Sequence, residues 1–205
     1  MAADLTFQGT LDLAASADPF DTGFEHMTRT ELDHGAWIDR QPGWVARPDG
    51  LFLAMLDGVD WHDGTEKIRG EEVPRPRQVA SFGSEGVPAG LTVLRDMSAA
   101  LSHRYGAMLD RITCNLYRDG QDSVAWHGDR IARERPSATV AIVSLGEPRP
   151  FRVRPKGGGN SIGWAAGRGD LIVMGGSCQR TYDHSVPKVA HAGPRIAVMF
   201  RHAYD

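Results

Sequence analysis

The C-terminal half of the chain is a succession of short apolar segments, each about the length of one strand, separated by turn residues. Valine, isoleucine, threonine and aromatic residues are common in these segments, and glycine, proline and aspartate separate them. The clearest segments are residues 112–117, 139–145, 151–153, 170–174 and 195–200. Many short strands separated by turn residues are typical of an antiparallel sandwich or barrel. This half of the chain is therefore predicted to form a β-rich core.

The preceding part of the chain favours helices in two places. One apolar stripe at helical spacing begins at residue 51, and a second covers residues 91–105 and ends before Gly106, a plausible stop signal. The stripes consist of Leu51, Met55 and Val59 in the first and of Val93, Leu94, Met97 and Leu101 in the second. Residues 1–50 look irregular, and residues 62–90 are predicted to form a loop or a short hairpin. The expected class is α+β, with N-terminal helices packed on a mainly β core.

Length and composition favour one globular domain over residues 1–205. No apolar run approaches the length of a membrane helix, so no membrane contact is expected. The first 20 residues carry Asp4, Asp12 and Asp18 and no basic residue, which argues against a targeting peptide and favours the cytoplasm. Cys114 and Cys178 are the only cysteines, so we expect two buried, reduced thiols rather than a disulfide framework.

The segment His127-Gly128-Asp129 is the strongest chemical signal, together with a remote histidine, His184. In a strand, residues two apart point to the same face, so His127 and Asp129 can aim at one ion. With His184 arriving from another strand, the three side chains would bind one face of an octahedral metal. Two histidines and one carboxylate are the ligand set of non-haem Fe(II) oxygenases, which leaves positions open for other ligands.

Two further pairs of residues flank this motif at even spacing. Asn115 and Tyr117 are two apart, and Arg195 and Arg201 are six apart, so each pair can face one side of a strand. The other face of the last segment is apolar and carries Ile196, Val198 and Phe200. Because an inward arginine needs an anion, the two arginines indicate a dicarboxylate cosubstrate.

In this order, Asn-x-Tyr, His-x-Asp, a distant His and Arg-x5-Arg, the chain resembles the AlkB-like Fe(II)/2-oxoglutarate dioxygenases. The resemblance covers roughly residues 112–201, with a fainter match at residues 73–83. It implies a double-stranded β-helix, or jelly roll, with N-terminal elements forming a lid. It also implies a division into an extension (1–50), helices and a nucleotide-recognition lid (51–110) and the jelly-roll core (111–205).

The resemblance assigns a role to each motif. It implies that iron is bound by His127, Asp129 and His184, and that 2-oxoglutarate is bound by Asn115, Tyr117, Arg195 and Arg201. His184 lies in the segment Tyr-Asp-His-Ser-Val-Pro, which looks like the family's distal-histidine turn, whereas the nearby His191 lacks this context. The chain departs from the family pattern at Ala197 and Met199, where two polar residues are usual, and at Ile131, which is often acidic in DNA-repair members.

The implied reaction uses Fe(II), 2-oxoglutarate and O2 to hydroxylate an N-methyl group of an alkylated base in DNA or RNA, and releases formaldehyde, succinate and CO2. The base must be single-stranded or flipped to reach the iron. Candidate lid residues lie within residues 61–82 and include Arg69, Arg75, Arg77 and Phe82. Candidate phosphate contacts are Arg152, Arg154 and Lys156. We expect a monomer.

Two other functions fit the same sequence. Ile131 and the net charge of −3 leave open a 2-oxoglutarate-dependent hydroxylase of a protein or small molecule. A non-catalytic β-sandwich binding module is the third possibility, and the absence of bound iron would favour it.

Overall fold

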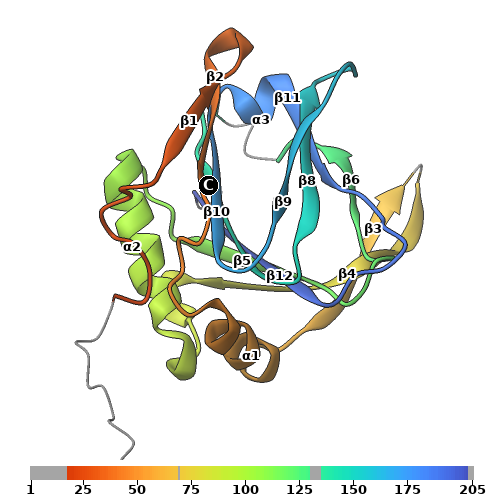
Figure 1. The fold of residues 1–205 in the computed structure, drawn as a ribbon. Helices are drawn as coiled ribbons and strands as arrows, with labels where there is room; N and C mark the ends of the chain where they lie inside the picture. The colour runs from red at the N-terminus through yellow and green to blue at the C-terminus, as the bar shows by residue number, and fades with distance from the viewer. Residues whose placement is uncertain (1–17, 69, 130–134, 203–205) are drawn as a thin grey trace, which may run out of the picture.

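A computed structural model describes residues 18–68, 70–129 and 135–202. Within these residues, two antiparallel sheets face each other, one of eight strands in the order β1-β2-β10-β7-β12-β5-β4-β3 and one of four in the order β6-β11-β8-β9 (Figure 1). The strands of the large sheet are β1 (Thr28–Glu31), β2 (Ala36–Gln41), β3 (His62–Ile68), β4 (Glu71–Gly83), β5 (Arg111–Tyr117), β7 (Val140–Gly146), β10 (Asp170–Gly176) and β12 (Arg195–Arg201). The small sheet consists of β6 (Val124–His127), β8 (Arg149–Pro155), β9 (Ile162–Ala166) and β11 (Tyr182–Val186). The predicted jelly-roll core with added helices is confirmed.

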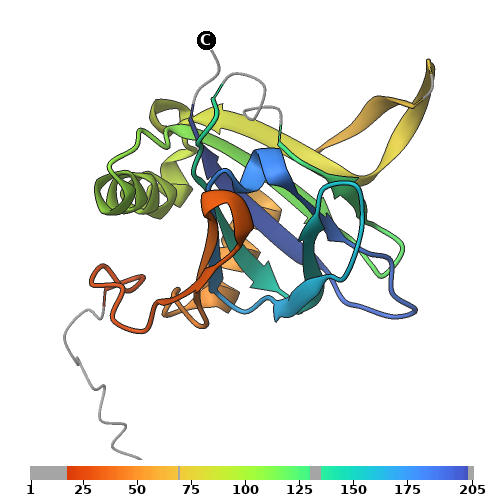
Figure 2. The same cartoon turned by 90° about the horizontal axis from the view of Figure 1, so that it is seen from above.

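The two long helices cover the outer face of the large sheet (Figure 2), whereas a short third helix packs at the inner layer between the sheets. The long helices are α1 (Pro48–Gly58) and α2 (Val93–Tyr105), the short one is α3 (Cys178–Thr181), before β11, and short 3-10 turns lie at Asp33–Gly35, Ser84–Gly86 and Ala89–Leu91. Both predicted helices are confirmed, and Gly106 ends α2 in the left-handed conformation at φ 59°. No helix in the described ranges is long and apolar enough to cross a bilayer.

The two faces of strand β12 pack in two different apolar layers. Its even-numbered residues pack in the apolar layer beneath the helices, whereas Ala197 and Met199 pack between the two sheets. The three even-numbered residues are Ile196, Val198 and Phe200, as the sequence predicts. Arg195 and Arg201 share the face of Ala197 and therefore point into the space between the sheets. Cys114 and Cys178 are buried and free, as predicted.

Two predictions of irregular structure are wrong. Within the first 50 residues, β1 and β2 pair with each other and β2 pairs with β10, so they extend the large sheet. The segment predicted as a loop or short hairpin is instead a long antiparallel hairpin of β3 and β4, and β4 also pairs with β5. Arginine, proline and glutamate hide the strand pattern there because much of β4 is only partly buried. The far ends of these two strands project from the rest of the molecule (Figures 1 and 2).

Candidate metal centre

Three side chains gather where β6 and β11 lie side by side. His127 and His184 are cross-strand partners in these two strands, and Asp129 lies two residues beyond the end of β6. One nitrogen of each histidine and one carboxylate oxygen all lie within 4.8 Å of one another. Nε2 of His127 is 3.7 Å and Nε2 of His184 is 4.0 Å from Oδ1 of Asp129. The predicted trio is thus brought together, whereas His191 lines a separate surface depression.

The two imidazoles present their Nε2 atoms to the centre of this cluster. Nδ1 of His127 lies 2.8 Å from the carbonyl oxygen of Ala125, and because a carbonyl only accepts, Nδ1 must donate the proton. This bond orients the His127 ring so that Nε2 is the nitrogen offered to a metal. His184 is buried, and this burial, together with the neighbouring His127, lowers its pKa to about 3. The buried His184 ring is thus neutral and can act as a metal ligand.

The carboxylate of Asp129 is fixed by its backbone and by one cation. The Asp129 amide donates to Oε1 of Gln179 at 2.9 Å. A Cβ on Gly128 would lie 2.5 Å from the Gln179 carbonyl oxygen, so only glycine permits this close approach. Burial alone would raise the pKa of Asp129, but the charge of Arg201, followed by those of His184 and His127, outweighs it and leaves the pKa lowered. Asp129 is therefore ionised at neutral pH.

Arg201 links the three-residue cluster to strand β12. Its Nε lies 3.0 Å from Oδ2 of Asp129, but the two atoms lack hydrogen-bond geometry, so the contact is an ion pair only. Nη2 of Arg201 meets Sδ of Met199 at 3.3 Å, and Nδ2 of Asn115 meets the same sulfur at 3.8 Å. Met199 is thus a weak acceptor for two of the residues predicted to bind the cosubstrate.

The second predicted arginine is fully enclosed. Arg195 is 1% exposed and lies directly across from Tyr117 in the pairing of β12 with β5. Its Nε donates to the Ala166 carbonyl at 3.1 Å and its Nη2 to Oγ of Ser144 at 2.7 Å. Its Nη1 has no hydrogen-bond partner among the described residues. A bound carboxylate could accept a hydrogen bond from this unused donor and would neutralise the buried charge of the guanidinium.

One cavity of about 500 Å³ joins both ends of the site. All seven predicted residues line it: His127, Asp129, His184, Asn115, Tyr117, Arg195 and Arg201. Arg111 and Thr113 also line it and were missed, although both have the same parity on β5 as Asn115 and Tyr117. That even spacing would have identified them.

The other predicted contacts divide into three groups. Arg75 and Arg77 on β4 line the same cavity, whereas Phe82 packs against the apolar layer beneath the helices, so the prediction of Phe82 in a lid is wrong. Arg152 and Lys156 are exposed, and Arg154 stacks 4.1 Å from the Trp126 ring. The remaining two residues, Arg69 and Ile131, lie outside the described residues.

The donor set fits a divalent iron ion and a dicarboxylate. Two imidazoles and one carboxylate converge without hydrogen bonds between them, and three ligands on one side leave room for a bidentate group. The unused donor of Arg195 lies in the same cavity as the cluster. The fold and the site together define a jelly-roll protein with a two-histidine, one-carboxylate metal centre.

The chain belongs to the 2OG-Fe(II) oxygenase superfamily, whose family model matches residues 49–201. The Fe(II) and 2-oxoglutarate in the name of this family agree with the predicted cofactors and with the donor set of the site. The enzyme prediction is confirmed over the binding-module alternative, and so is the AlkB-like resemblance, because the similar curated proteins are AlkB homologues.

Among these relatives, the human "Alpha-ketoglutarate-dependent dioxygenase alkB homolog 3" is 28% identical over 80% of this chain. The chain spans 65% of that protein's length. The Arabidopsis thaliana "DNA oxidative demethylase ALKBH2" is 32% identical, with 92% of this chain and 73% of the relative covered.

Two solved structures share the fold. An oxidoreductase of the 2OG-Fe(II) oxygenase family from Burkholderia pseudomallei has a TM-score of 0.56 and 16% identity, with 80% of this chain and 84% of that chain covered. A prolyl hydroxylase from Trichoplax adhaerens, solved with a peptide of hypoxia inducible factor, has a TM-score of 0.55 and 13% identity, with 74% of each chain covered.

Proposed function

We propose that this protein oxidatively demethylates alkylated bases in DNA or RNA, releasing formaldehyde, succinate and CO2. The observation that carries the proposal is the single cavity, which joins the histidine and carboxylate cluster to the two arginines and to the β3–β4 hairpin. The AlkB homologues support the nucleic-acid substrate, since one of them is named as a DNA oxidative demethylase.

In this proposal, His127, Asp129 and His184 bind the iron. The backbone carbonyl of Ala125 orients the His127 ring, and burial keeps His184 neutral, so the His184 ring does not need to lose a proton before it binds. The bound ferrous ion would supply the oxidising chemistry with 2-oxoglutarate and O2. The protein's task is to position the reactants and to exclude side reactions.

Asn115, Tyr117, Arg195 and Arg201 bind 2-oxoglutarate in this proposal. Arg201 touches Asp129 and therefore lies at the metal end, whereas Arg195 lies at the far end and offers its unused Nη1 to the distal carboxylate. Because Arg195 is almost fully buried, the ion pair formed there is shielded from solvent. This end of the pocket would set the preference for a five-carbon diacid.

Basic side chains in the lining of the cavity support a polyanionic substrate. His62 and Arg75 come from the β3–β4 hairpin, and Arg111 comes from β5. A base within a duplex cannot reach the metal, so the substrate base must be flipped or single-stranded. The hairpin is the part of the lid that contacts nucleotides in this proposal. The monomeric state, the cytoplasmic location, and the single domain with the boundaries given above remain predictions.

The test is a turnover assay with Fe(II), 2-oxoglutarate and a panel of N-methylated DNA and RNA oligonucleotides. We expect formaldehyde and succinate in equal amounts for at least one oligonucleotide, and neither product from His127→Ala. Iron content is measured in parallel. Substrate-dependent succinate only with peptides or small molecules would overturn the proposal and favour the hydroxylase alternative.

A further inference from the structure

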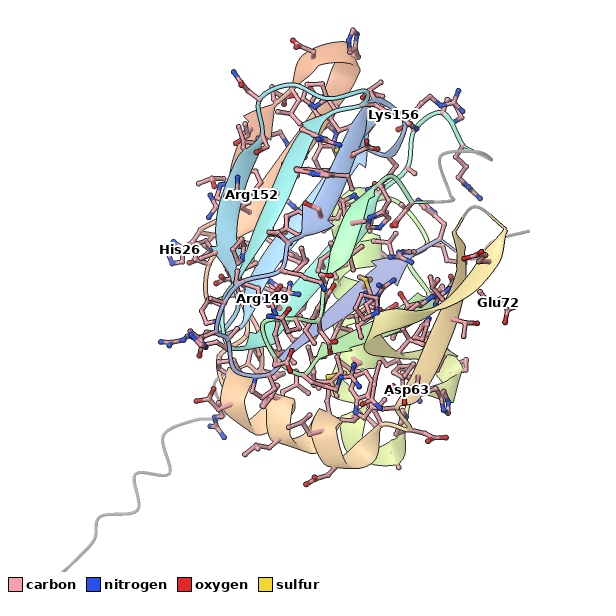
Figure 3. All side chains as sticks on the ribbon, turned by 90° about the vertical axis from the view of Figure 1, so that its right-hand side faces the viewer. His26, Asp63, Glu72, Arg149, Arg152 and Lys156 are labelled. Carbon is pink, nitrogen blue, oxygen red and sulfur yellow. The ribbon has the colours of Figure 1, made fainter. Side chains whose placement is uncertain are left out.

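Arg149 is a second buried arginine beside the cosubstrate pocket, and the sequence analysis gives it no role. It is 1% exposed at the start of β8, whereas Arg152 on the same strand is exposed (both are labelled in Figure 3). Its Cζ lies 5.9 Å from the centroid of the Tyr117 ring, and Cζ of Arg195 lies 5.1 Å from the same centroid. Two guanidinium groups therefore flank Tyr117.

The Arg149 donors bind backbone carbonyls of two loops. Nη1 donates to Asp119 at 2.7 Å, and Nη2 lies 2.9 Å from the carbonyl oxygens of both Asp122 and Pro187 and 3.4 Å from that of Gly120. Within the described residues, these bonds involve no carboxylate. The charges of Asp119 and Asp122 also act on this cation, although neither carboxylate is hydrogen-bonded to it. Because a buried cation is costly, a further anion beside Tyr117 would stabilise it more.

The loop that Arg149 binds joins β5 to β6 and also contacts the substrate-side hairpin. The Ser123 amide donates to the Pro76 carbonyl at 2.8 Å, and Nη1 of Arg77 donates to the Ser123 carbonyl at 3.2 Å. Arg118 pairs with Asp63 of β3 at 3.6 Å. The same short loop is thus attached to Arg149 beside the cosubstrate pocket and to the β3–β4 hairpin.

We propose that Arg149 is a positioning residue for 2-oxoglutarate. It fixes the loop of residues 118–123 behind Tyr117, and its charge adds to that of Arg195 where the distal carboxylate binds. Bound 2-oxoglutarate compensates both cations, so it stabilises this loop and, through it, the attachment of the hairpin. Arg149 acts through Tyr117 and the loop, without itself lining the cavity.

The experiment compares Arg149→Gln and Arg149→Lys with Arg152→Gln, an exposed control on the same strand. Binding of 2-oxoglutarate and of oxalate to the Mn(II)-loaded full chain is measured by calorimetry, with no nucleic acid present. Oxalate can chelate the metal but has no distal carboxylate. We expect Arg149→Gln to weaken the binding of 2-oxoglutarate roughly tenfold, because a positive charge near the buried anion is lost. The same change should weaken the binding of oxalate less than about twofold. Arg149→Lys should recover part of this loss, and Arg152→Gln should match the wild type.

Equal weakening of both ligands, or of neither, would overturn the proposal. A measurement on the wild type covers the case in which Arg149→Gln does not fold. Bound 2-oxoglutarate should slow hydrogen exchange at the backbone amides of residues 118–123. Unchanged exchange at these amides would also overturn the proposal. Because neither readout uses nucleic acid, a failure here is distinct from a failure of the demethylase proposal.

Discussion

His127 and His184 are direct cross-strand partners in β6 and β11, and their ring centroids lie 4.2 Å apart. Residues 57 positions apart in the chain thereby present their Nε2 atoms to one carboxylate. The pairing register of the small sheet, rather than any loop, sets the distance between the two histidines. Metal binding should therefore be sensitive to changes that shift these two strands.

Gly128→Ala should disrupt the cluster without removing a ligand. The new Cβ would lie 2.5 Å from the Gln179 carbonyl oxygen, so Asp129 or α3 must move. We expect a loss of about 1–3 kcal/mol in the free energy of unfolding, together with weaker iron binding. Chemical denaturation and metal titration measure the two effects. Gly50→Ala is the control, since its Cβ meets nothing within 4 Å in α1 and should stabilise the helix by about 0.5–1 kcal/mol. Normal iron binding by Gly128→Ala would contradict this account of the site.

Arg195→Ala should abolish tight binding of 2-oxoglutarate while leaving the metal ligands intact. Removing the buried partner of a carboxylate costs about 3 kcal/mol, or roughly 100-fold in the dissociation constant. Calorimetry of 2-oxoglutarate with Mn(II)-loaded protein tests this, and Mn(II) affinity in the absence of 2-oxoglutarate is the control. A change in Mn(II) affinity alone would mean that Arg195 serves the metal end instead.

The metal-free protein should lose stability as the pH falls from 7 to 5. Burial lowers the pKa of His184 to about 3 in the folded state, whereas the pKa of an ordinary histidine is 6.5. Below pH 6.5, the unfolded chain binds a proton at this residue that the folded chain does not, so acid favours unfolding. His184 alone should make the free energy of unfolding fall by up to about 1.4 kcal/mol for each unit of pH. Denaturation at several pH values should show the slope reduced in His184→Gln and retained in His191→Gln, a change at an exposed histidine.

Arg75→Ala should weaken nucleic-acid binding and leave 2-oxoglutarate binding unchanged. Arg75 lines the cavity from β4 and is not among the residues predicted to bind 2-oxoglutarate. If it contacts a phosphate, the slope of log affinity against log salt should fall by about 1. Fluorescence anisotropy with a methylated oligonucleotide at several salt concentrations gives this slope. Arg95→Ala on α2, which covers the opposite face of the large sheet, should match the wild type.

Even spacing in the strand segments allowed most of the site to be predicted from sequence. Asn115 and Tyr117 share one face of β5 with Arg111 and Thr113, and Arg195 and Arg201 share one face of β12. These strands are buried on both faces or nearly so, and the alternation of side chains fixes which residues meet the cavity. The helices were predictable for the same reason, since each buries one apolar stripe.

The remainder depends on contacts that have no local pattern. Strand β11 has the sequence Tyr-Asp-His-Ser-Val, and its three central polar residues do not give the apolar pattern of a strand. These residues are accommodated in a strand because of the metal cluster and the neighbouring strands. The role of Arg149 depends on carbonyl groups from two distant loops, which the sequence does not bring together. Phe82 alternates onto the helix-facing side of β4, and the length of that strand could not be read from its partly exposed residues.

A crystal structure of the Mn(II) and 2-oxoglutarate complex tests the central claim most directly. The account predicts one anomalous peak within bonding distance of Nε2 of His127, Nε2 of His184 and the carboxylate of Asp129, with the distal carboxylate of 2-oxoglutarate on Nη1 of Arg195. A metal bound without His184, or a cosubstrate that does not reach Arg195, would contradict it.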